Sequence, residues 1–368
     1  MKKALCLLLA GTMVFGATAC GSSNKKGSGE KGKAEEQVLR LAISGEPTIL
    51  DPFQIQDDTA YNISYAVTEP LFRIAGEDGK EWVPGLATEY EMNEDATVYT
   101  VKLREDAKWS DGTAITSEDV VYSFQRAVDP EFASPKANDY FEIKNAEAIA
   151  KGEMDKSELG VKALDDYTLE VTFVNPIPYA LHLFSFSSFY PLNQKAYEEI
   201  GADKYAKDAD KVVTNGAYKI EEWVHDDHVT LAKNEDHYNA SEVSIPKVKY
   251  LMLKDSNARM NAFKAGQIDS INITGEQMEQ AKKEGMNLTT YVDNSNWYFQ
   301  FNTKKKELSN AKIRQALGMA IDTESLCKNV IKTGAEPATG IVPTSIAGAD
   351  GNSYAKTLGD ITEYNTEK

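Results

Sequence analysis

The chain has 368 residues, more than one hydrophobic core usually serves, so we expect two or three globular units. Hydrophobic residues make up 42% of the sequence and aromatic residues 10%, which excludes a chain that is disordered throughout. The formal net charge of −17 argues against a protein that binds by neutralising phosphates, and we therefore expect no nucleic-acid partner.

Residues 1–19 are typical of an export signal peptide. The first three residues carry two lysines, and residues 4–15 form an apolar stretch that is too short to span a bilayer with the usual flanks. Small residues then lead to Cys20 in a pattern that resembles the lipobox of bacterial lipoproteins, although Ala17 stands where that pattern prefers Leu. We expect cleavage before Cys20 and lipidation of its thiol; an ordinary cleavage site is the alternative.

Residues 20–37 are rich in Gly, Ser, Lys and Glu, and this composition predicts a flexible tether. Two or more acyl chains anchor a protein stably, so we expect it on the extracytoplasmic face of the cell membrane, held by lipid. No later segment offers the roughly 18 consecutive apolar residues of a membrane span. With Cys20 lipidated, Cys327 has no disulfide partner, and its helical apolar surroundings predict an inert, buried thiol.

The pattern of apolar residues predicts alternating strands and helices, and so a mixed α/β fold. Alternation of apolar and polar residues indicates strands at four places, residues 38–43, 97–103, 168–174 and 247–253. Thr116 and Asp119 resemble a capping box ahead of apolar residues at helical spacing, which predicts a helix from residue 117. A second helical region is predicted over residues 310–332, with Asp322 as an internal N-cap and Gly334 as its end.

Residues 218–224 and 229–231 predict two strands joined at a hairpin tip, residues 225–228. The tip reads His-Asp-Asp-His and therefore holds four side chains of the kind that ligate metals. We favour a solvated tip over a metal site, because no further ligand and no supporting shell converge on it. The sequence thus predicts neither a bound metal nor a cofactor.

One long stretch of the chain resembles a known family. Residues 97–113 and then 117–124 are similar to the signature of the large solute-binding proteins that serve oligopeptide, dipeptide and nickel ABC importers. Shorter matches appear in the family's order at residues 50–52, 69–72, 84–87, 165–170, 214–218, 263–269, 301–303 and 313–317. Residues 133–135 and 176–179 are most similar to the oligopeptide receptors. This resemblance covers nearly the whole chain, from about residue 39 to residue 343.

The resemblance implies a two-lobed α/β fold that closes on a ligand, with an extra α/β domain on the first lobe. By this resemblance lobe I comprises residues 38–68 and 192–288, the extra domain residues 69–191, and a partial lobe II residues 289–368. Members of the family continue for many residues beyond the position that matches residue 368. We therefore expect that the chain is cut short within lobe II.

The implied function is binding of peptides in the cleft between the lobes and their delivery to the permease subunits of an ABC importer. Main-chain hydrogen bonds along an extended peptide suit broad specificity. A carrier of nickel, haem or another small solute, or a peptide-pheromone receptor, is the alternative on the same scaffold. No nucleophile, base and stabilising group converge in the sequence, so a hydrolase is less favoured and we expect no enzyme. We expect a monomer.

Six residues are candidate peptide contacts by resemblance: Gln56, Asp57, Asp58, Lys136, Trp297 and Tyr298. Residues 53–58 match the stretch that runs beside the ligand in oligopeptide receptors, and a carboxylate is often found where Gln56 stands. Lys136 stands where the family commonly has a tyrosine and is a candidate partner for a peptide carboxylate. The alternatives are a solvated loop at residues 56–58 and a surface lysine at 136.

The aromatic candidates lie in residues 296–302, which match a strand that enters lobe II beside the cleft. Alternation places Trp297 and Tyr298 on opposite faces of that strand, and one face must be core. Packing is therefore the alternative to recognition for both aromatic residues. Residues 109–112, Trp-Ser-Asp-Gly, are the most recognisable motif, but they indicate a structural turn whose Trp packs onto the extra domain.

Overall fold

A computed structural model describes residues 37–75, 81–291, 294–348, 350–359 and 364–365 of the chain. The predicted signal peptide, the lipidation of Cys20 and nearly all of the predicted tether lie outside these residues. Across the described ranges, no helix has both the length and the apolar character needed to cross a bilayer.

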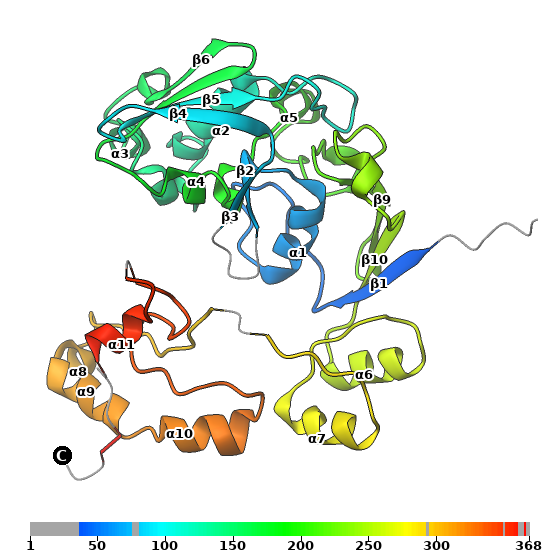
Figure 1. The fold of residues 1–368 in the computed structure, drawn as a ribbon, viewed down its shortest axis with the longest axis vertical. Coiled ribbons are helices and arrows are strands. Elements are labelled where there is room, and N and C mark those ends of the chain that lie inside the picture. Colours follow the sequence, from blue (N-terminus) through cyan, green and yellow to red (C-terminus); the bar gives the residue numbers. More distant parts are fainter. Residues whose placement is uncertain (1–36, 76–80, 292–293, 349, 360–363, 366–368) are drawn as a thin grey trace, which may run out of the picture. The chain divides into compact units, whose positions relative to one another are not determined.

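Among the described residues, the first strand in sequence pairs with the last to form the edge of a four-stranded sheet. The strand order is β1-β10-β9-β8, with β1 parallel to β10 and the other pairs antiparallel. The strands are β1 (Val38–Ile43), β8 (Tyr218–Val224), β9 (His228–Lys233) and β10 (Lys247–Met252), and Figure 1 shows blue β1 beside yellow-green β10. Strands β8 and β9 form the predicted hairpin, so the alternation patterns at these places are confirmed.

A second four-stranded sheet is antiparallel throughout, in the order β4-β5-β7-β6. Its strands are β4 (Ala87–Met92), β5 (Val98–Leu103), β6 (Val161–Asp165) and β7 (Thr168–Thr172), and the separate hairpin is β2 (Phe72–Ala75) with β3 (Glu81–Pro84). All six strands come from the segment predicted as the extra domain, whereas the first sheet uses the segments predicted as lobe I. The domain boundaries themselves stay predictions.

Helix α2 (Ser117–Val128) begins where the capping pattern predicts it. Its N-cap is Thr116, whose backbone N–H donates to the carboxylate of Asp119 at 3.0 Å. The α-helices of this part of the chain are α1 (Asp58–Val67), α3 (Ala146–Ala150), α4 (Ala180–Leu183), α5 (Gln194–Ile200), α6 (Ser256–Lys264) and α7 (Gly275–Lys283). Short 3-10 turns are η1 (Ala137–Tyr140), η2 (Lys156–Glu158), η3 (Ser187–Phe189), η4 (Ala209–Lys211) and η5 (Ala240–Glu242).

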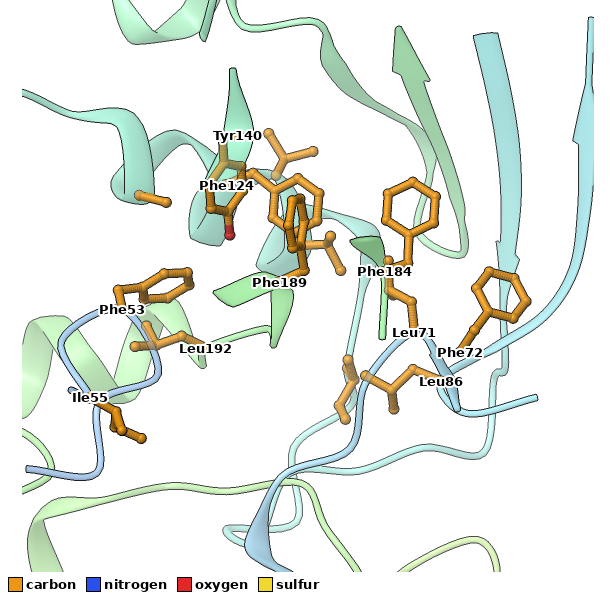
Figure 2. Packing of buried hydrophobic residues seen from close by; sticks show 14 of the residues in the cluster. Phe53, Ile55, Leu71, Phe72, Leu86, Phe124, Tyr140, Phe184, Phe189 and Leu192 are labelled. Carbon is orange, nitrogen blue, oxygen red and sulfur yellow. The ribbon is translucent and has the colours of Figure 1, made fainter. Parts of the chain in front are cut away.

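Aromatic side chains form the centre of the core around α2. Phe124, Tyr140 and Phe189 are fully buried and point toward one another in Figure 2. The rings of Tyr140 and Phe189 stack with centroids 4.4 Å apart, and Phe124 meets both edge-on at 5.2 and 5.4 Å. Each large aromatic side chain buries roughly 150–250 Å². This cluster therefore holds η1 and η3 against α2.

A buried ion pair joins α2 to the loop after β1. The guanidinium of Arg126 lies 2.6 Å from the carboxylate of Asp51, and their side chains are 5% and 1% exposed. Asp51 also accepts from the backbone N–H of Phe53 at 3.0 Å, and the Arg126 guanidinium stacks 3.6 Å from the ring centroid of Phe132. Because both charges are removed from water, the loss of either partner would leave the other as an uncompensated buried charge.

The motif at residues 109–112 is a structural turn, as predicted. Hydrogen bonds join it to a second motif, residues 214–218, because Ser110 and Thr214 contact each other across 104 residues of sequence. The backbone N–H of Ser110 donates to the Thr214 carbonyl at 2.7 Å, and the Thr214 N–H donates to the Ser110 hydroxyl at 3.1 Å. Trp109 is buried, and its indole N–H donates to Asp119 at 3.2 Å. The contacts of this motif are thus with the protein's own backbone and core.

The same second motif also fastens the chain segment at residues 67–69. The side-chain amide of buried Asn215 accepts from the Glu69 N–H at 2.9 Å and donates to the Glu69 carbonyl at 3.2 Å. Gly216 approaches so closely that a Cβ there would lie 2.3 Å from the carbonyl carbon of Val67. Only glycine fits this contact, which joins the two segments where the extra domain is predicted to begin.

The later part of the chain is helical where the capping residues predict it. Its elements are α8 (Lys306–Ser309), α9 (Ala311–Met319), α10 (Thr323–Ser325), the π-helical turn η6 (Leu326–Ile331) and α11 (Tyr354–Leu358). Asn310 caps α9 by accepting from Lys312 N–H at 2.9 Å, and Asp322 caps α10 by accepting from Ser325 N–H at 2.8 Å. Cys327 is a free thiol in η6 and is half-buried rather than buried.

The structure differs from expectation at residues 296–302, which form no strand. The side chain of Asn296 donates instead to the carbonyls of Gly340 and Ile341 at 3.0 and 2.7 Å. A strand needs a neighbouring strand to satisfy its backbone groups. Among the described residues nothing pairs with this segment as a sheet, and this is the physical reason for the difference.

Candidate functional site

A cavity of about 770 Å³ is lined by residues from four separate segments. These are the stretch from α1 to β2, the loop around residue 136, residues 185–190 and residues 217–218. The volume is in the range of small-molecule and cofactor pockets, which is roughly 300–1,000 Å³. Segments that are far apart in sequence thus converge on one hollow.

One wall of the cavity is aromatic. Tyr61 and Tyr65 lie one turn apart on α1, and their rings stack with centroids 6.1 Å apart. Tyr65 is 61% exposed and Phe186 is 50% exposed, so large apolar surfaces are left uncovered where they line the cavity. The hydroxyls of Tyr65 and Tyr190 are neutral hydrogen-bond donors at neutral pH, because the ordinary pKa of a phenol is 10.0 and burial raises the pKa of both groups further.

Lys136 lines the same cavity and is held in place by Tyr61. Its ammonium group donates to the hydroxyl of Tyr61 and lies 5.0 Å from the centroid of that ring. The Tyr61 hydroxyl in turn donates to the carbonyl of Ile55 at 3.2 Å, which leaves its lone pairs to accept from the lysine. The lysine is half-buried.

The backbone beside Lys136 is fixed as well. Ser134 is buried, and its hydroxyl donates to the Phe53 carbonyl at 2.7 Å while accepting from the Lys136 N–H at 3.0 Å. The segment around Lys136 is therefore hydrogen-bonded to the loop that precedes α1, and the side chain to α1 itself. Such pre-ordering lowers the entropy that a ligand must overcome when it binds.

A second charged group at the cavity is already neutralised. The carboxylate of Glu69 lies 3.2 Å from Nε of Arg73, close enough for an ion pair although the angle is too poor for a hydrogen bond. The hydroxyl of Tyr238 donates to the same carboxylate at 2.8 Å, and the guanidinium of Arg104 lies over the Tyr238 ring at 3.2 Å. Glu69 and Arg73 thus neutralise each other's charge, so they shape the cavity wall but add no unpaired charge to it.

The six candidate contacts are in different surroundings. Lys136 lines the cavity. Asp57 is the N-cap of α1, where its carboxylate accepts from the Ala60 N–H at 2.8 Å and the Thr48 hydroxyl at 2.6 Å, and Asp58 is the first residue of that helix. Gln56 is exposed.

The two aromatic candidates, Trp297 and Tyr298, are 94% and 68% exposed and are not among the residues that line the cavity. For all six candidates, contact with a ligand remains a prediction of the resemblance, and Lys136 alone of them lines the cavity. The structure adds Asp57 as the residue that starts the helix bearing the aromatic wall.

The aromatic wall itself was not predicted. Tyr61 and Tyr65 are four residues apart, a spacing that places them on one face of a helix and was readable in the sequence. Phe186 and Tyr190 flank the short 3-10 turn η3 and carry no such signal. What the tyrosines face depends on the packing of residues 185–190, which no local pattern shows.

Another cavity, of about 730 Å³, lies on the extra domain's sheet and is lined by residues such as Trp82, Tyr90 and Leu181. It is formed within the segment predicted as a single domain and contains none of the six candidate residues. We therefore favour the cavity beside α1 as the functional site.

The hairpin tip carries two histidines that are each paired with carboxylates. His225 lies 2.7 Å from Glu46 and 2.8 Å from Asp208, and these hydrogen bonds raise the pKa of the His225 imidazole. His228 lies 3.0 Å from Glu222. Within the described ranges, no group of three or more His, Cys, Asp and Glu side chains is placed to hold a metal ion.

Comparison with known proteins identifies the family of this architecture. Residues 81–368 match the family model of the bacterial extracellular solute-binding proteins, family 5, middle part. The chain is 32% identical over 352 residues to the oligopeptide-binding protein OppA of Bacillus subtilis. This alignment covers 94% of this chain and 64% of that protein. It thus spans less than two thirds of the length of this relative.

Solved structures agree in fold. The substrate-binding domain of an oligopeptide ABC transporter from Bacillus anthracis superposes with a TM-score of 0.82 at 34% identity, over 90% of this chain and 64% of that one. OppA of Listeria monocytogenes, solved bound to peptide, gives a TM-score of 0.80 at 32% identity, over 91% and 66%. The two-lobed α/β fold with an extra domain is therefore shown, as the sequence resemblance implied.

Proposed function

This chain belongs to family 5 of the bacterial extracellular solute-binding proteins, and from this premise we propose that it binds peptides and delivers them to an ABC importer. The observation that carries the proposal is the cavity beside α1, where stacked tyrosines and a fixed lysine line one hollow. Aromatic surface suits the varied side chains of peptides, and neutral phenols suit their backbone groups. The relatives that are named for oligopeptides or solved with a bound peptide support this choice of ligand.

The proposed recognition needs no covalent chemistry. An extended peptide satisfies its own backbone through hydrogen bonds to the protein, while its side chains occupy a roomy, hydrated cavity. Lys136, Tyr61 and Tyr65 are the contacts that we propose first, and Gln56, Asp57 and Asp58 are proposed to lie at the cavity's edge. Trp297 and Tyr298 are proposed to approach the peptide from the opposing lobe when the protein closes.

Native mass spectrometry of the freshly purified protein tests the ligand class. We expect a heterogeneous ladder of masses that match peptides of mixed sequence. A single metal or haem adduct would instead favour the alternative carrier, and one unique peptide would favour a pheromone receptor. Denaturing spectra of the same sample are the control, because they show only the mass of the chain.

We also propose that the protein is a monomer on the extracytoplasmic face of the membrane, anchored by lipid on Cys20. Replacing Cys20→Ser removes the thiol that would carry the lipid and leaves the folded part unchanged. The variant should then move from the membrane fraction to the soluble fraction in cell fractionation. If Cys20→Ser still sediments with membranes after a salt wash, the lipid anchor is wrong.

A further inference from the structure

The cavity beside α1 holds one cation that the described part of the protein does not neutralise. Four charged residues line it, namely Glu69, Arg73, Lys136 and Asp139. Glu69 and Arg73 pair with each other, and Arg73 also donates to the Pro84 carbonyl at 3.3 Å. Among the described residues no carboxylate forms an ion pair with Lys136, whose ammonium group contacts the neutral hydroxyl of Tyr61.

The surroundings of this ammonium group favour an anionic partner. An ammonium group has three N–H donors, and the Tyr61 hydroxyl accepts one of them. Removing a cation partly from water costs free energy unless an opposite charge or further acceptors replace the water. A ligand that brings a carboxylate to Lys136 supplies both an opposite charge and further hydrogen-bond acceptors.

The fixed position of Lys136 also suits it to discriminate between anionic and neutral groups of a ligand. Hydrogen bonds to Tyr61, and through Ser134 to Phe53, fix the lysine before any ligand arrives. A fixed cation discriminates by charge, because a neutral amide at the same place is a weaker acceptor than a carboxylate and brings no opposite charge. A mobile surface lysine would not discriminate in this way.

We infer that Lys136 determines specificity by binding an anionic group of the peptide, either its terminal carboxylate or the carboxylate of an acidic side chain. The inference rests on the proposed function, since it names the chemistry that one part of the proposed peptide site selects. Asp139 lines the same cavity and is half-buried, and its negative charge would oppose this preference.

The test offers the whole protein a mixture of random tetrapeptides and pentapeptides, prepared once as free acids and once as C-terminal amides. Native mass spectrometry identifies the bound peptides and their relative amounts. A preference of about tenfold or more for free acids over amides indicates the terminal carboxylate. Enrichment of Asp and Glu over Asn and Gln among bound amides indicates the side-chain carboxylate instead.

Lys136→Met keeps the long apolar stem but removes the charge, so the preference should fall toward equality. Lys136→Arg keeps the charge and should retain most of the preference. Lys162→Met is the matched control, because that lysine lies in the same predicted domain with a side chain that is 71% exposed. Tyr61→Phe removes only the hydroxyl that holds the ammonium group and should give an intermediate loss even if Lys136→Met folds poorly.

The outcomes separate this inference from the proposed function. If the unaltered protein captures no peptide from either mixture, the proposed function fails and the inference fails with it. If the protein binds peptides but shows no anionic preference, or if the preference is the same in Lys136→Met and Lys162→Met, only the inference is overturned.

Discussion

The described parts of residues 38–291 and of residues 294–365 both carry apolar residues at regular spacing but bury them very differently. Phe53, Phe124 and Phe189 in the first region are fully buried, whereas Phe299 is 73% exposed and Trp297 is 94% exposed. The difference shows that an apolar pattern predicts a helix or strand and which of its faces is apolar, but does not predict whether that face is buried. Burial requires a second surface, and in the first region two sheets and α2 supply one.

The helices of the second region make the same point. Ile313 and Leu317 lie one turn apart on α9, yet they are 43% and 44% exposed. Helix α9 forms at the predicted place because its N-cap and its helix-forming residues are local features. In the described part of this region, Ala355 is the one hydrophobic residue that is buried. Local propensity therefore produces helices there without a core.

The largest expected contrast comes from truncating one phenylalanine in each region. Phe189→Ala should lower the free energy of unfolding by about 4 kcal/mol, because it empties a fully buried aromatic site stacked on Tyr140. Phe299→Ala should change it by less than about 0.5 kcal/mol, since its ring is already in contact with water. Urea denaturation followed by circular dichroism measures both. Equal losses in the two variants would contradict the comparison.

Removing one partner of the buried ion pair should cost nearly as much. Arg126→Met leaves the carboxylate of Asp51 buried without its cation, and we expect a loss of about 3 kcal/mol in the free energy of unfolding. Lys151→Met is the control, because its pair with Glu147 is equally short, at 2.6 Å, but more than half exposed. That control should lose far less, because solvent screens an exposed ion pair. A small effect of Arg126→Met would show that the pair is hydrated.

Two glycines sharpen the comparison further. Gly216→Ala forces a methyl group against the backbone of residues 66–68 and should destabilise the first region by about 1–3 kcal/mol. Gly318→Ala should instead stabilise α9 by up to about 1 kcal/mol, because nothing lies within 4 Å of the added Cβ. Denaturation measures the first effect, and hydrogen exchange of the α9 amides measures the second. Faster exchange in Gly318→Ala would mean that α9 is packed.

The smallest expected effect is the pH dependence of the hairpin tip. The pKa of His225 is raised by its hydrogen bonds to Asp208 and Glu46, so its contribution is complete below its ordinary value of 6.5 and is lost as pH rises through the raised value. Burial would raise the pKa of Glu46, but bonds from Asp226, His225 and Trp223 lower it overall. Its contribution is therefore present above 4.5 and is lost as pH falls.

Stability from this cluster should therefore be greatest between about pH 4.5 and 6.5, and His225→Gln should flatten the dependence. We expect less than about 1 kcal/mol, because the imidazole is half exposed and its ion pairs are screened by solvent. Melting temperatures of the two proteins from pH 4 to pH 8 measure the difference. Parallel curves would show that His225 contributes no pH dependence.

Local features of the sequence were sufficient for most of the predicted elements and for the family. Alternation in residues 38–43 predicted β1, the Thr116 and Asp119 pattern predicted the start of α2, and Asn310 and Asp322 begin helices as expected. Each of these signals acts over a few residues, where hydrogen bonds and side-chain spacing decide the backbone conformation. The motif order then identified the solute-binding scaffold.

The cavity was decided by tertiary structure alone. Lys136 meets Tyr61 across 75 residues, and Asn215 holds Glu69 across 146 residues, so no local period encodes either contact. The segment at residues 296–302 shows the converse, since a strand-like pattern forms no strand among the described residues without a neighbour to pair with. A local pattern of side chains can be read from consecutive residues. A cavity or a sheet depends instead on which segments from distant parts of the sequence pack beside one another.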